Sequence, residues 1–460
     1  MNLKRAGRVA AVLAAVCGAG LGTTEAAAAA QPAPKPAASQ AAASQPVAWG
    51  ATNSAPAGAR GELFGVAAAS SADVLAVGGY NPGQPPTEVL TSPYAEHWTG
   101  GGWSATSVPL GQVYPSGEQA AQLNGVTEVA PGDGWAVGTV SDVSSLASKT
   151  LAYHWDGTAW TRFPTPDPAG QTLPNQLSAV AARATNDVWA AGYDNYPGEA
   201  SLVLHWNGTA WSKVSVPNIG ALDAVAVAPG RVWVAGGNRV AQFNGTTWAK
   251  LPTPPVTSQD SVVITGLAHN AAGLWVVGNL EFTCGEGGVC TASYAALWNG
   301  TAWTQIPGGG GTGLTGVVAA GSKVLATSGG QVFGLSLTGG DTEVTPAPGA
   351  LQLQAIAADP AGNPWAVGQN GAQPGIINAP GIGQGGIIVT TGAANATVTW
   401  AGPVTGSGGT DVSGRFAVGG LPDGSYTVIA SLAGCQPGIA AAAVTAGHAI
   451  AVEAHITCPS

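Results

Sequence analysis

The sequence predicts an all-β protein: a seven-bladed β-propeller closed by an N-terminal strand and followed by a small β-sandwich. Three observations predict this fold class. The 460 residues include 70 Gly and 16 Trp, but only 8% are charged. Two short motifs each recur seven times within residues 47–383. Successive copies are 60 residues apart from Leu75 to Trp135 and 40 apart from Leu325 to Trp365, a spacing typical of four-stranded blades rather than of shorter solenoid repeats.

Composition and charge exclude several classes of protein. Soluble proteins have about 25% charged residues, and helical bundles are rich in Glu, Lys and Leu, so a bundle is excluded. Nucleic-acid binding needs a basic surface, whereas the chain has 14 Lys and Arg against 24 Asp and Glu. A hydrophobic content of 45% can offset the entropy of ordering. We therefore expect a folded chain with no nucleic-acid partner.

The N-terminus has the order of a secretory signal. Lys4, Arg5 and Arg8 precede an apolar run over residues 9–21, and small residues follow as far as Ala30. The run has about 13 residues, fewer than the roughly 20 that a transmembrane helix needs. We expect cleavage after Ala30, a secreted, extracellular location and no transmembrane segment.

Two further expectations concern this end of the chain. Residues 1–30 form the predicted signal peptide, and residues 31–46 are a Pro/Ala-rich stretch that predicts a tether without a core. A lipid anchor at Cys17 is a minor alternative, because Val16 is bulkier than the small residue that such signals carry before their Cys.

Four cysteines remain after the predicted cleavage, and an even number in an exported chain indicates disulfides. Proximity favours Cys284 with Cys290, and Cys435 with Cys458. A metal site at the first pair lacks companions, because the nearest histidine in sequence, His269, lies outside the loop and zinc usually takes four ligands.

The two repeated motifs mark the first and second strands of each unit. The first motif is Leu-x-Gly/Ala-Val or a close variant, found at residues 63–66, 123–126, 177–180, 222–225, 264–267, 314–317 and 353–356. The second has the type Asp-Val-Trp-Ala-Val-Gly and ends at Gly78, Gly138, Gly192, Gly236, Gly278, Ser328 and Gly368.

A third motif supplies the other two strands. Residues 154–160, 205–211 and 297–303 share the pattern Trp-Asp/Asn-Gly-Thr-Ala-Trp, with looser copies at 97–103 and 243–248. Asp-Gly or Asn-Gly between apolar residues indicates a two-residue hairpin turn whose two positions both have φ > 0. Each unit should therefore contain four strands.

The seventh unit lacks this hairpin, and a segment before the first unit can complete it. Residues 49–56, beginning at Trp49, align with the outer-strand segment 103–109 but have no preceding strands of their own. We expect this segment to pair with the last unit and to close the propeller. These repeats resemble those of secreted bacterial β-propellers of the kelch-like or WD-like kind, a resemblance that implies blades and no chemistry.

Residues 387–460 form a separate predicted module. Residues 396–400 and 410–428 show strand patterns, the second with a Leu-Pro-Asp-Gly turn. The Gly-Arg-Phe, Gly-Leu-Pro-Asp-Gly and Tyr-Thr-Val sequences resemble the carboxypeptidase regulatory-like domain, a prealbumin-like β-sandwich with a carbohydrate-binding-like fold. The resemblance implies adhesion, spacing or sugar binding, and not peptidase activity. Cys435 stands where that family usually has an aromatic residue.

No residue pattern indicates catalysis. His97, His154 and His205 recur at one position of the repeat, which indicates a structural role, and no spacing typical of a zinc site or nucleophile motif is present. Fifteen of the Trp also fall at repeat positions, so we expect them to be structural rather than sugar-stacking. We expect no enzyme activity, no cofactor and no metal.

The candidate ligand-binding residues lie in loops of variable length. Segments 79–93, 139–149, 193–200 and 279–293, between second and third strands, are long, and loops held by a rigid scaffold often carry function. Together with the connections between blades they should open on one face. The candidate residues are Tyr80, Tyr114, Tyr193, Asp194, Asn195, Tyr196 and Phe282.

These observations favour a secreted, non-catalytic binding protein. Its expected partner is an extracellular polysaccharide or a protein, engaged through the long-loop face and, as a further option, through the C-terminal sandwich, and the protein should be a monomer. Two alternatives are a structural cell-surface spacer and a propeller-type glycan-active enzyme. The enzyme needs convergent charged groups, which 8% charged residues make hard to assemble.

Overall fold

The computed structural model describes residues 50–52, 60–81, 90–100, 103–115, 117, 119–145, 147–170, 172–194, 200–256, 260–284, 288–306, 313–320, 323–337, 342–346, 351–371, 373–378, 385–403, 405–410, 414–421, 424–444 and 449–458. The predicted signal peptide, the tether and Trp49 lie outside these ranges. All of the regular elements within them are β-strands, so the prediction of an all-β protein is confirmed. The described segments include no apolar helix of membrane-spanning length.

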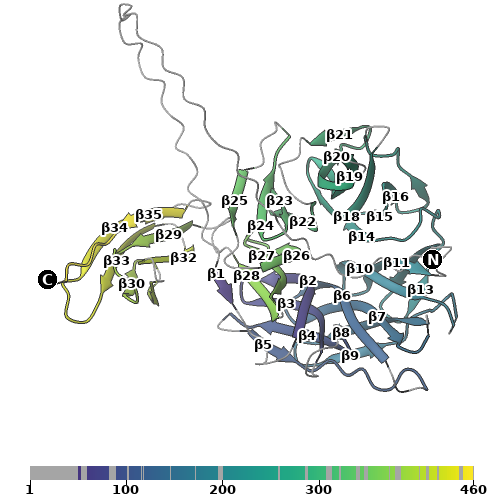
Figure 1. Cartoon of the computed structure of the whole chain (residues 1–460), viewed down its shortest axis with the longest axis horizontal. Helices are drawn as coiled ribbons and strands as arrows, with labels where there is room; N and C mark the ends of the chain where they lie inside the picture. The colour runs from purple at the N-terminus through teal and green to yellow at the C-terminus, as the bar shows by residue number, and fades with distance from the viewer. Residues whose placement is uncertain are drawn as a thin grey trace, which may run out of the picture. The chain divides into compact units, whose positions relative to one another are not determined.

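The strands up to residue 378 form four-stranded antiparallel sheets, numbered here in chain order (Figure 1). Sheet 1 consists of β2 (Arg60–Ser70), β3 (Asp73–Asn81), β4 (Ser92–Trp98) and β5 (Trp103–Thr106). Sheet 2 consists of β6 (Gln119–Ala130), β7 (Asp133–Asp142), β8 (Ser148–Trp155) and β9 (Trp160–Phe163). Sheet 3 consists of β10 (Asn175–Ala184), β11 (Asp187–Asp194), β12 (Ala200–Trp206) and β13 (Trp211–Lys213). Sheets 4 and 5 are built from β14 (Ala224–Ala228), β15 (Arg231–Gly236), β16 (Arg239–Phe243) and β17 (Trp248–Lys250); and β18 (Ser261–Asn270), β19 (Gly273–Cys284), β20 (Gly288–Trp298) and β21 (Trp303–Ile306).

The last two of these sheets differ in how they are completed. Sheet 6 consists of β22 (Gly316–Ala320), β23 (Lys323–Ser328), β24 (Gln331–Leu335) and β25 (Thr342–Pro346). Sheet 7 takes β26 (Leu351–Ala358), β27 (Pro364–Asn370) and β28 (Gln373–Asn378) from one end of the region, and its fourth strand, β1 (Gly50–Thr52), from the other. β1 pairs antiparallel with β28, with Ala51 opposite Ile377.

A β-bulge explains the glycine that ends the second motif. In sheets 1, 2, 3, 5 and 7 the first strand bulges directly after the Leu or Ile of the first motif. In sheet 2 the carbonyl before Leu123 lies so close to β7 that a Cβ on Gly138 would be 2.0 Å from the carbonyl oxygen of Gln122. Only glycine fits such a close backbone approach, so the paired motifs encode one structural unit.

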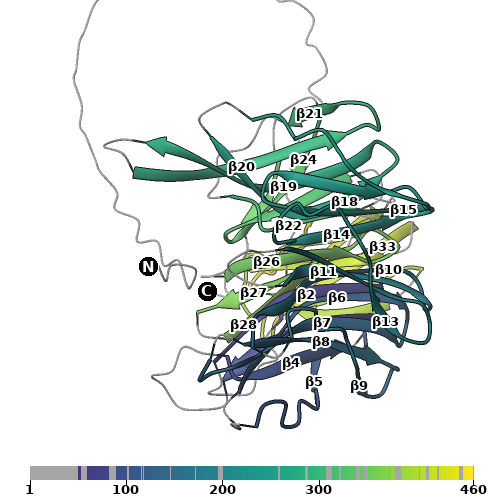
Figure 2. The same ribbon diagram turned by 90° about the vertical axis from the view of Figure 1, so that its right-hand side faces the viewer.

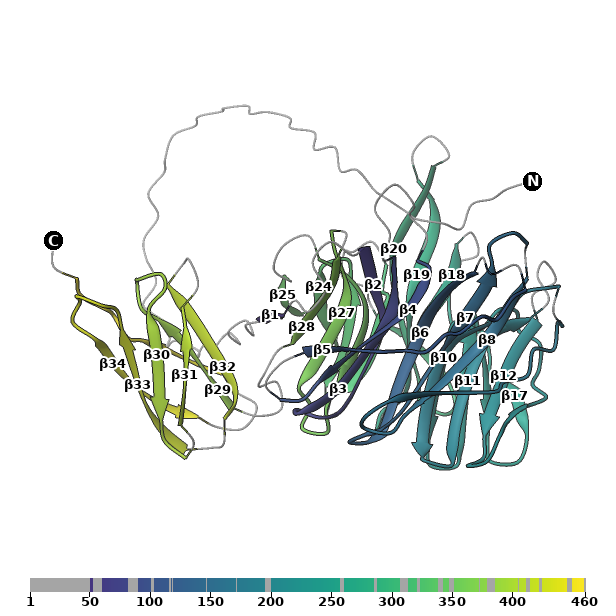
Figure 3. The same ribbon diagram turned by 90° about the horizontal axis from the view of Figure 1, so that it is seen from below.

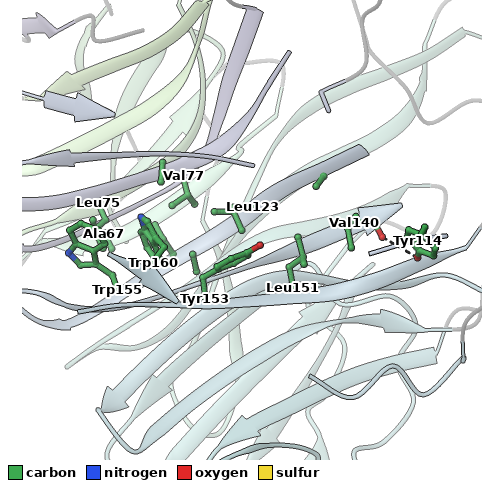
Figure 4. Packing of buried hydrophobic residues seen from close by; sticks show 14 of the residues in the cluster. Ala67, Leu75, Val77, Tyr114, Leu123, Val140, Leu151, Tyr153, Trp155 and Trp160 are labelled. Atoms are coloured by element: carbon green, nitrogen blue, oxygen red, sulfur yellow. Dashed lines mark hydrogen bonds between the residues drawn. The ribbon is translucent and has the colours of Figure 1, made fainter. Parts of the chain in front are cut away.

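Successive sheets pack face to face through apolar clusters. One cluster joins sheets 1 and 2 through residues such as Leu75, Leu123 and Trp155 (Figure 4), and similar clusters join each later sheet to the next. A further cluster packs sheet 7 against sheet 1, with Trp365 and Leu63 both buried in it. The first strands also contact one another in order, and β26 contacts β2. Figure 1 shows these first strands arranged around a common centre.

Three Asp–His pairs fix the ends of sheets 1 to 3 at which the first strand turns into the second. The Nε2 atoms of His97, His154 and His205 lie 2.7, 2.8 and 3.0 Å from carboxylate oxygens of Asp73, Asp133 and Asp187. The imidazole of His205 also stacks on Trp189 with centroids 4.2 Å apart. These histidines therefore hold one strand end against its neighbour, which is the structural role that their recurrence in the repeat predicts.

The C-terminal strands form two further sheets. The order β31 (Thr405–Gly409), β30 (Thr397–Ala401), β33 (Gly424–Ser431), β34 (Gly438–Val444) makes a four-stranded sheet, and β32 (Arg415–Leu421), β29 (Gly385–Thr390), β35 (Ala449–Glu453) a three-stranded one. One apolar cluster includes residues of both sheets. Within it the indole of Trp400 stacks on Phe416, with centroids 5.5 Å apart. The disulfide Cys435–Cys458 is present, as the sequence predicts.

Two sequence expectations about loops are wrong. The turn between third and fourth strands contains four residues, as between Trp155 and Trp160, which face each other across the hairpin. In this turn only Gly157 has a positive φ. The side chain of Asp156 instead caps the turn by accepting hydrogen bonds from Thr158 and Ala159, and these bonds lower the pKa of Asp156 to about 2.

The long segments between second and third strands are also more regular than expected. Most of segment 279–293 is strand, because β19 and β20 remain paired as far as Cys284 and Gly288. The Cys284–Cys290 disulfide, which is present as predicted, links the two strands at this end. Figure 2 shows the hairpin of β19 and β20 extending past the strands beside it, and Figure 3 shows the same extension from another side.

Candidate functional site

Antiparallel pairing divides the loops of sheets 1 to 7 between two ends. The second strand passes to the third, and the fourth to the first of the next sheet, at one end, which we call the loop end. The first strand turns into the second, and the third into the fourth, at the opposite end, which we call the turn end. The sequence-predicted candidate residues all belong to the loop end.

Tyr114 is part of the core rather than of an accessible surface. Its side chain is only 5% exposed and lies in the cluster between sheets 1 and 2. Its hydroxyl donates a hydrogen bond to the carbonyl oxygen of Val140, drawn as a dashed line in Figure 4. The ammonium group of Lys149 lies 4.9 Å from the centre of its ring. Burial raises the pKa of Tyr114 to about 12, so the hydroxyl is neutral and anchors the connection from sheet 1 to sheet 2.

Asp194 and Tyr193 lie at the end of β11. The carboxylate of Asp194 is buried and forms an ion pair of 2.8 Å with the Nζ atom of Lys213, on the outer strand of the same sheet. The half-buried Tyr193 has its hydroxyl 3.3 Å from the Oε1 atom of Gln176, to which it donates a hydrogen bond. Asn195 and Tyr196 lie outside the described residues. The carboxylate of Asp194 therefore has its ion-pair partner within its own sheet.

Tyr80 and Phe282 are half-buried at the ends of two other sheets. The ring of Tyr80 packs against Tyr94, with centroids 5.5 Å apart. Phe282, expected in a loop, is in strand β19 opposite Cys290. With Tyr193 they come from sheets 1, 3 and 5, and they line neither of the two cavities described below. The structure thus spreads Tyr80, Tyr193 and Phe282 over the loop end instead of joining them in one of these cavities.

Exposed aliphatic side chains are the more distinctive feature of the loop end. Val143, Leu173 and Val289 are 57%, 38% and 71% exposed. Val143 lies between β7 and β8, Leu173 between sheets 2 and 3, and Val289 near the tip of the β19–β20 hairpin. At the turn end, Leu337 is 51% exposed. Sequence reasoning missed these residues because it searched the loops for aromatic and polar side chains. The sequence feature that could have identified them is an apolar residue within a loop.

A cavity of about 180 Å³ lies where the first strands of the seven sheets meet. Its wall includes Asn124 and Thr265, which stand at the bulges of their strands, and Thr315, which directly precedes β22. Each donates a side-chain hydrogen bond to a carbonyl of the next sheet: Asn124 to Leu177 at 2.7 Å, Thr265 to Leu314 at 2.6 Å and Thr315 to Leu353 at 2.9 Å. These polar groups join neighbouring sheets.

Several titratable groups elsewhere also make structural contacts. The Asp–His pairs hold strand ends, and Glu128 of sheet 2 accepts a hydrogen bond of 3.0 Å from the backbone nitrogen of Ala69 in sheet 1. Burial, and then the negative charge of Asp73, raise the pKa of Glu128 to about 9. Within the described ranges, His, Cys, Asp and Glu form no group of three or more that could hold a metal ion.

Comparisons with known proteins identify no family. No protein-family model matches the chain, and no curated protein matches it. YCF48 bound to D1 peptide is 13% identical over 72% of this chain and 96% of that one, with a TM-score of 0.46. Virginiamycin B lyase from Staphylococcus aureus is 11% identical over 72% and 98%, with a TM-score of 0.48. The WD40 repeats of RRP9 are 12% identical over 72% and 99%, with a TM-score of 0.46.

These similar structures are β-propeller and WD40-like folds. One is bound to a peptide and another is a lyase. At these identities and TM-scores the likeness assigns no ligand and no reaction to this chain.

Proposed function

We propose that this chain is a secreted, non-catalytic binding protein whose seven sheets form one β-propeller, closed by β1, and whose loop end engages an extracellular polysaccharide or protein. The C-terminal sheets act as a sandwich of the carboxypeptidase regulatory-like kind that spaces the propeller or adds contacts to sugar.

Packing and pairing support the closed propeller. β1 adds the fourth strand to sheet 7, and sheet 7 packs against sheet 1 through the cluster around Trp365. Each first strand lines the same cavity. In a closed propeller each sheet has another sheet on both of its faces, so its apolar side chains are buried. This burial favours closure.

The exposed aliphatic residues of the loop end carry the proposal of binding. Val143, Leu173 and Val289 lie on three separate segments that open at this end. An exposed apolar patch is typical of an interaction site, and these side chains would supply the apolar contacts of one. The stapled β19–β20 hairpin would present Val289 on a rigid element, which limits the entropy lost on binding.

The structural contacts of the acidic groups and histidines in sheets 1 to 3 support a role without turnover. An active site needs acid, base or nucleophilic groups that converge on a free position. The Asp–His pairs of sheets 1 to 3 hold neighbouring strand ends together, and Asp194 forms an ion pair with Lys213.

A glycan array probed with the full secreted chain, together with product analysis, tests this function. We expect binding to at least one extracellular polysaccharide or to a protein-linked glycan, and recovery of that ligand unchanged after prolonged incubation. Cleavage or elimination of the bound glycan would contradict the non-catalytic proposal and favour the enzyme. Silence on the array, together with no binding to extracellular proteins of the producing cells, would favour the spacer.

A further inference from the structure

A second cavity lies at the turn end, between sheets 4 and 5. It has a volume of about 240 Å³, and its wall includes Arg231, Trp233, His269, Asn270 and Asn299. These residues come from the turns of two neighbouring sheets. The cavity is therefore on the opposite side of the sheets from the loop end, and its role does not depend on the function proposed there.

The first feature of this cavity is an arginine at a position that is acidic in earlier sheets. Arg231 begins β15 as Asp133 begins β7 and Asp187 begins β11. Gln242 stands opposite Trp233, where His205 stands opposite Trp189. The Asp–His pair is thus replaced, and the guanidinium group of Arg231 is exposed at the cavity.

Arg231 also differs from the arginine of the preceding junction. The guanidinium of Arg183 pairs with Asp187 at 2.6 Å and donates to the carbonyl of Ala228. Arg231 has no carboxylate partner in the part of the chain that the structure describes, and the cavity wall contains no Asp or Glu. Its charge is therefore available to a ligand.

The second feature is a pair of amide groups whose oxygens are already used. The Oδ1 atom of Asn270 accepts hydrogen bonds from the backbone of Ala272 at 3.0 Å and from the indole of Trp275 at 3.1 Å. The Oδ1 atom of Asn299 accepts from the backbone of Thr301 and Ala302, both at 2.9 Å. Because the oxygens are occupied, the Nδ2 groups of both residues remain as donors, with no acceptor among the described residues. The cavity thus offers donors and a positive charge.

The third feature is a flat ring at the cavity wall. The imidazole of His269 lies over the indole of Trp233, with centroids 4.9 Å apart and an angle of 19° between the planes. Burial, and then the positive charge of Arg231, lower the pKa of His269. These effects favour the uncharged form of the ring, whose exposed face can pack against a ring of a ligand while Arg231 supplies the charge.

We propose that this cavity binds a small carboxylate that carries a ring, such as a uronic-acid residue. The guanidinium group of Arg231 matches the two oxygens of a carboxylate. The amide nitrogens of Asn270 and Asn299 donate to other oxygens of the ligand, and His269 packs against its ring. The cavity wall has no carboxylate to accept hydrogen bonds from a cationic or neutral ligand. Selectivity against such ligands therefore comes from this missing acceptor rather than from shape.

Titration calorimetry with the full chain tests this site. The probes are glucuronate, its neutral counterpart glucose, inorganic phosphate and sulfate. We expect glucuronate to bind at millimolar or lower concentration, glucose to bind at least tenfold more weakly, and the two inorganic anions, which cannot pack against the ring, to be weaker than glucuronate. The variant Arg231→Gln should weaken glucuronate binding about tenfold, and Arg231→Lys should recover only part of it.

The matched control is Arg239→Gln. Arg239 is an exposed arginine of the same sheet that begins β16 at the loop end, so this variant removes the same charge from the chain but not from the cavity. Unchanged glucuronate binding in Arg231→Gln, an equal loss in Arg239→Gln, or glucose binding as tightly as glucuronate would each overturn the site. Phosphate and sulfate binding as tightly as glucuronate would overturn the ring-bearing carboxylate and leave a general anion site.

Discussion

Gln354 of β26 donates a hydrogen bond of 2.8 Å from its Nε2 atom to the Oε1 atom of Glu62 in β2, although 292 positions separate the two residues. Burial raises the pKa of Glu62, and the bond from Gln354 opposes that shift. This bond crosses the junction of sheets 7 and 1, where Trp365 contacts Trp98 and Trp103 with centroids 5.5 and 5.8 Å apart. The first and last sheets are therefore held by polar and aromatic contacts.

Removing Trp365 should weaken this junction strongly. Trp365 is 3% exposed and packs between sheets 7 and 1, so Trp365→Ala leaves a cavity that the surrounding strands cannot fill. We expect the free energy of unfolding to fall by about 3–5 kcal/mol in denaturant titrations. Trp303→Ala, at a half-buried outer-strand position, is the control and should cost less. Equal losses in the two variants would contradict a tight junction between the two sheets.

The bulge-facing glycines should not tolerate a methyl group. A Cβ on Gly138 would lie 2.0 Å from a backbone oxygen, which has no rotamer by which to move away. Gly138→Ala should therefore lower the free energy of unfolding by about 3 kcal/mol. On Gly409 the nearest contact would be at 4.0 Å, so Gly409→Ala should be close to neutral. A neutral Gly138→Ala would show that the bulge is not required.

The positions of the hairpin turns, though not their length, the disulfides and the buried Trp positions could be predicted from sequence because each depends on residues that are near in the chain or repeated. Asn207, for example, caps its own turn by accepting from Thr209 and Ala210. The contacts of Tyr114 could not be predicted, because its core position depends on Val140 and Lys149, which belong to another sheet. The cavity around Arg231 was missed for the same reason, since His269 reaches it from the next sheet.

Stability should decrease with pH because of Glu128. Its pKa is raised from 4.5 to about 9 in the folded protein, so the folded state holds a proton that the unfolded state has released. The contribution of this group is complete below about pH 4.5 and falls by about 1.4 kcal/mol per unit as pH rises toward 9. Glu128→Gln keeps the volume and does not titrate.

Denaturant titrations of the wild type and Glu128→Gln at pH 5, 7 and 9 measure this effect. The variant should gain stability relative to the wild type by about 3 kcal/mol between pH 5 and pH 7, and the difference should widen at higher pH. A difference that does not change with pH would show that Glu128 is ionised in the folded protein.

The two disulfides should contribute unequally. Cys435 and Cys458 are 23 positions apart, whereas Cys284 and Cys290 are 6 apart. Because a longer closed loop restricts the unfolded chain more, the double variant Cys435→Ser/Cys458→Ser should lose about 3 kcal/mol. Cys284→Ser/Cys290→Ser should chiefly increase proteolysis at the hairpin tip. Mass spectrometry of protease fragments distinguishes the two effects, and cleavage in the same region in both variants would contradict this division.

Binding through the loop end is tested most directly by calorimetric titration of the array-identified ligand into three proteins. These are the wild type, the triple variant Val143→Ser/Leu173→Ser/Val289→Ser at the loop end, and Leu337→Ser at the turn end. All four side chains are exposed, so the substitutions should leave the fold unchanged. We predict that the triple variant weakens binding at least tenfold and that Leu337→Ser binds as the wild type does. Wild-type affinity in the triple variant, or an equal loss in Leu337→Ser, would contradict the account.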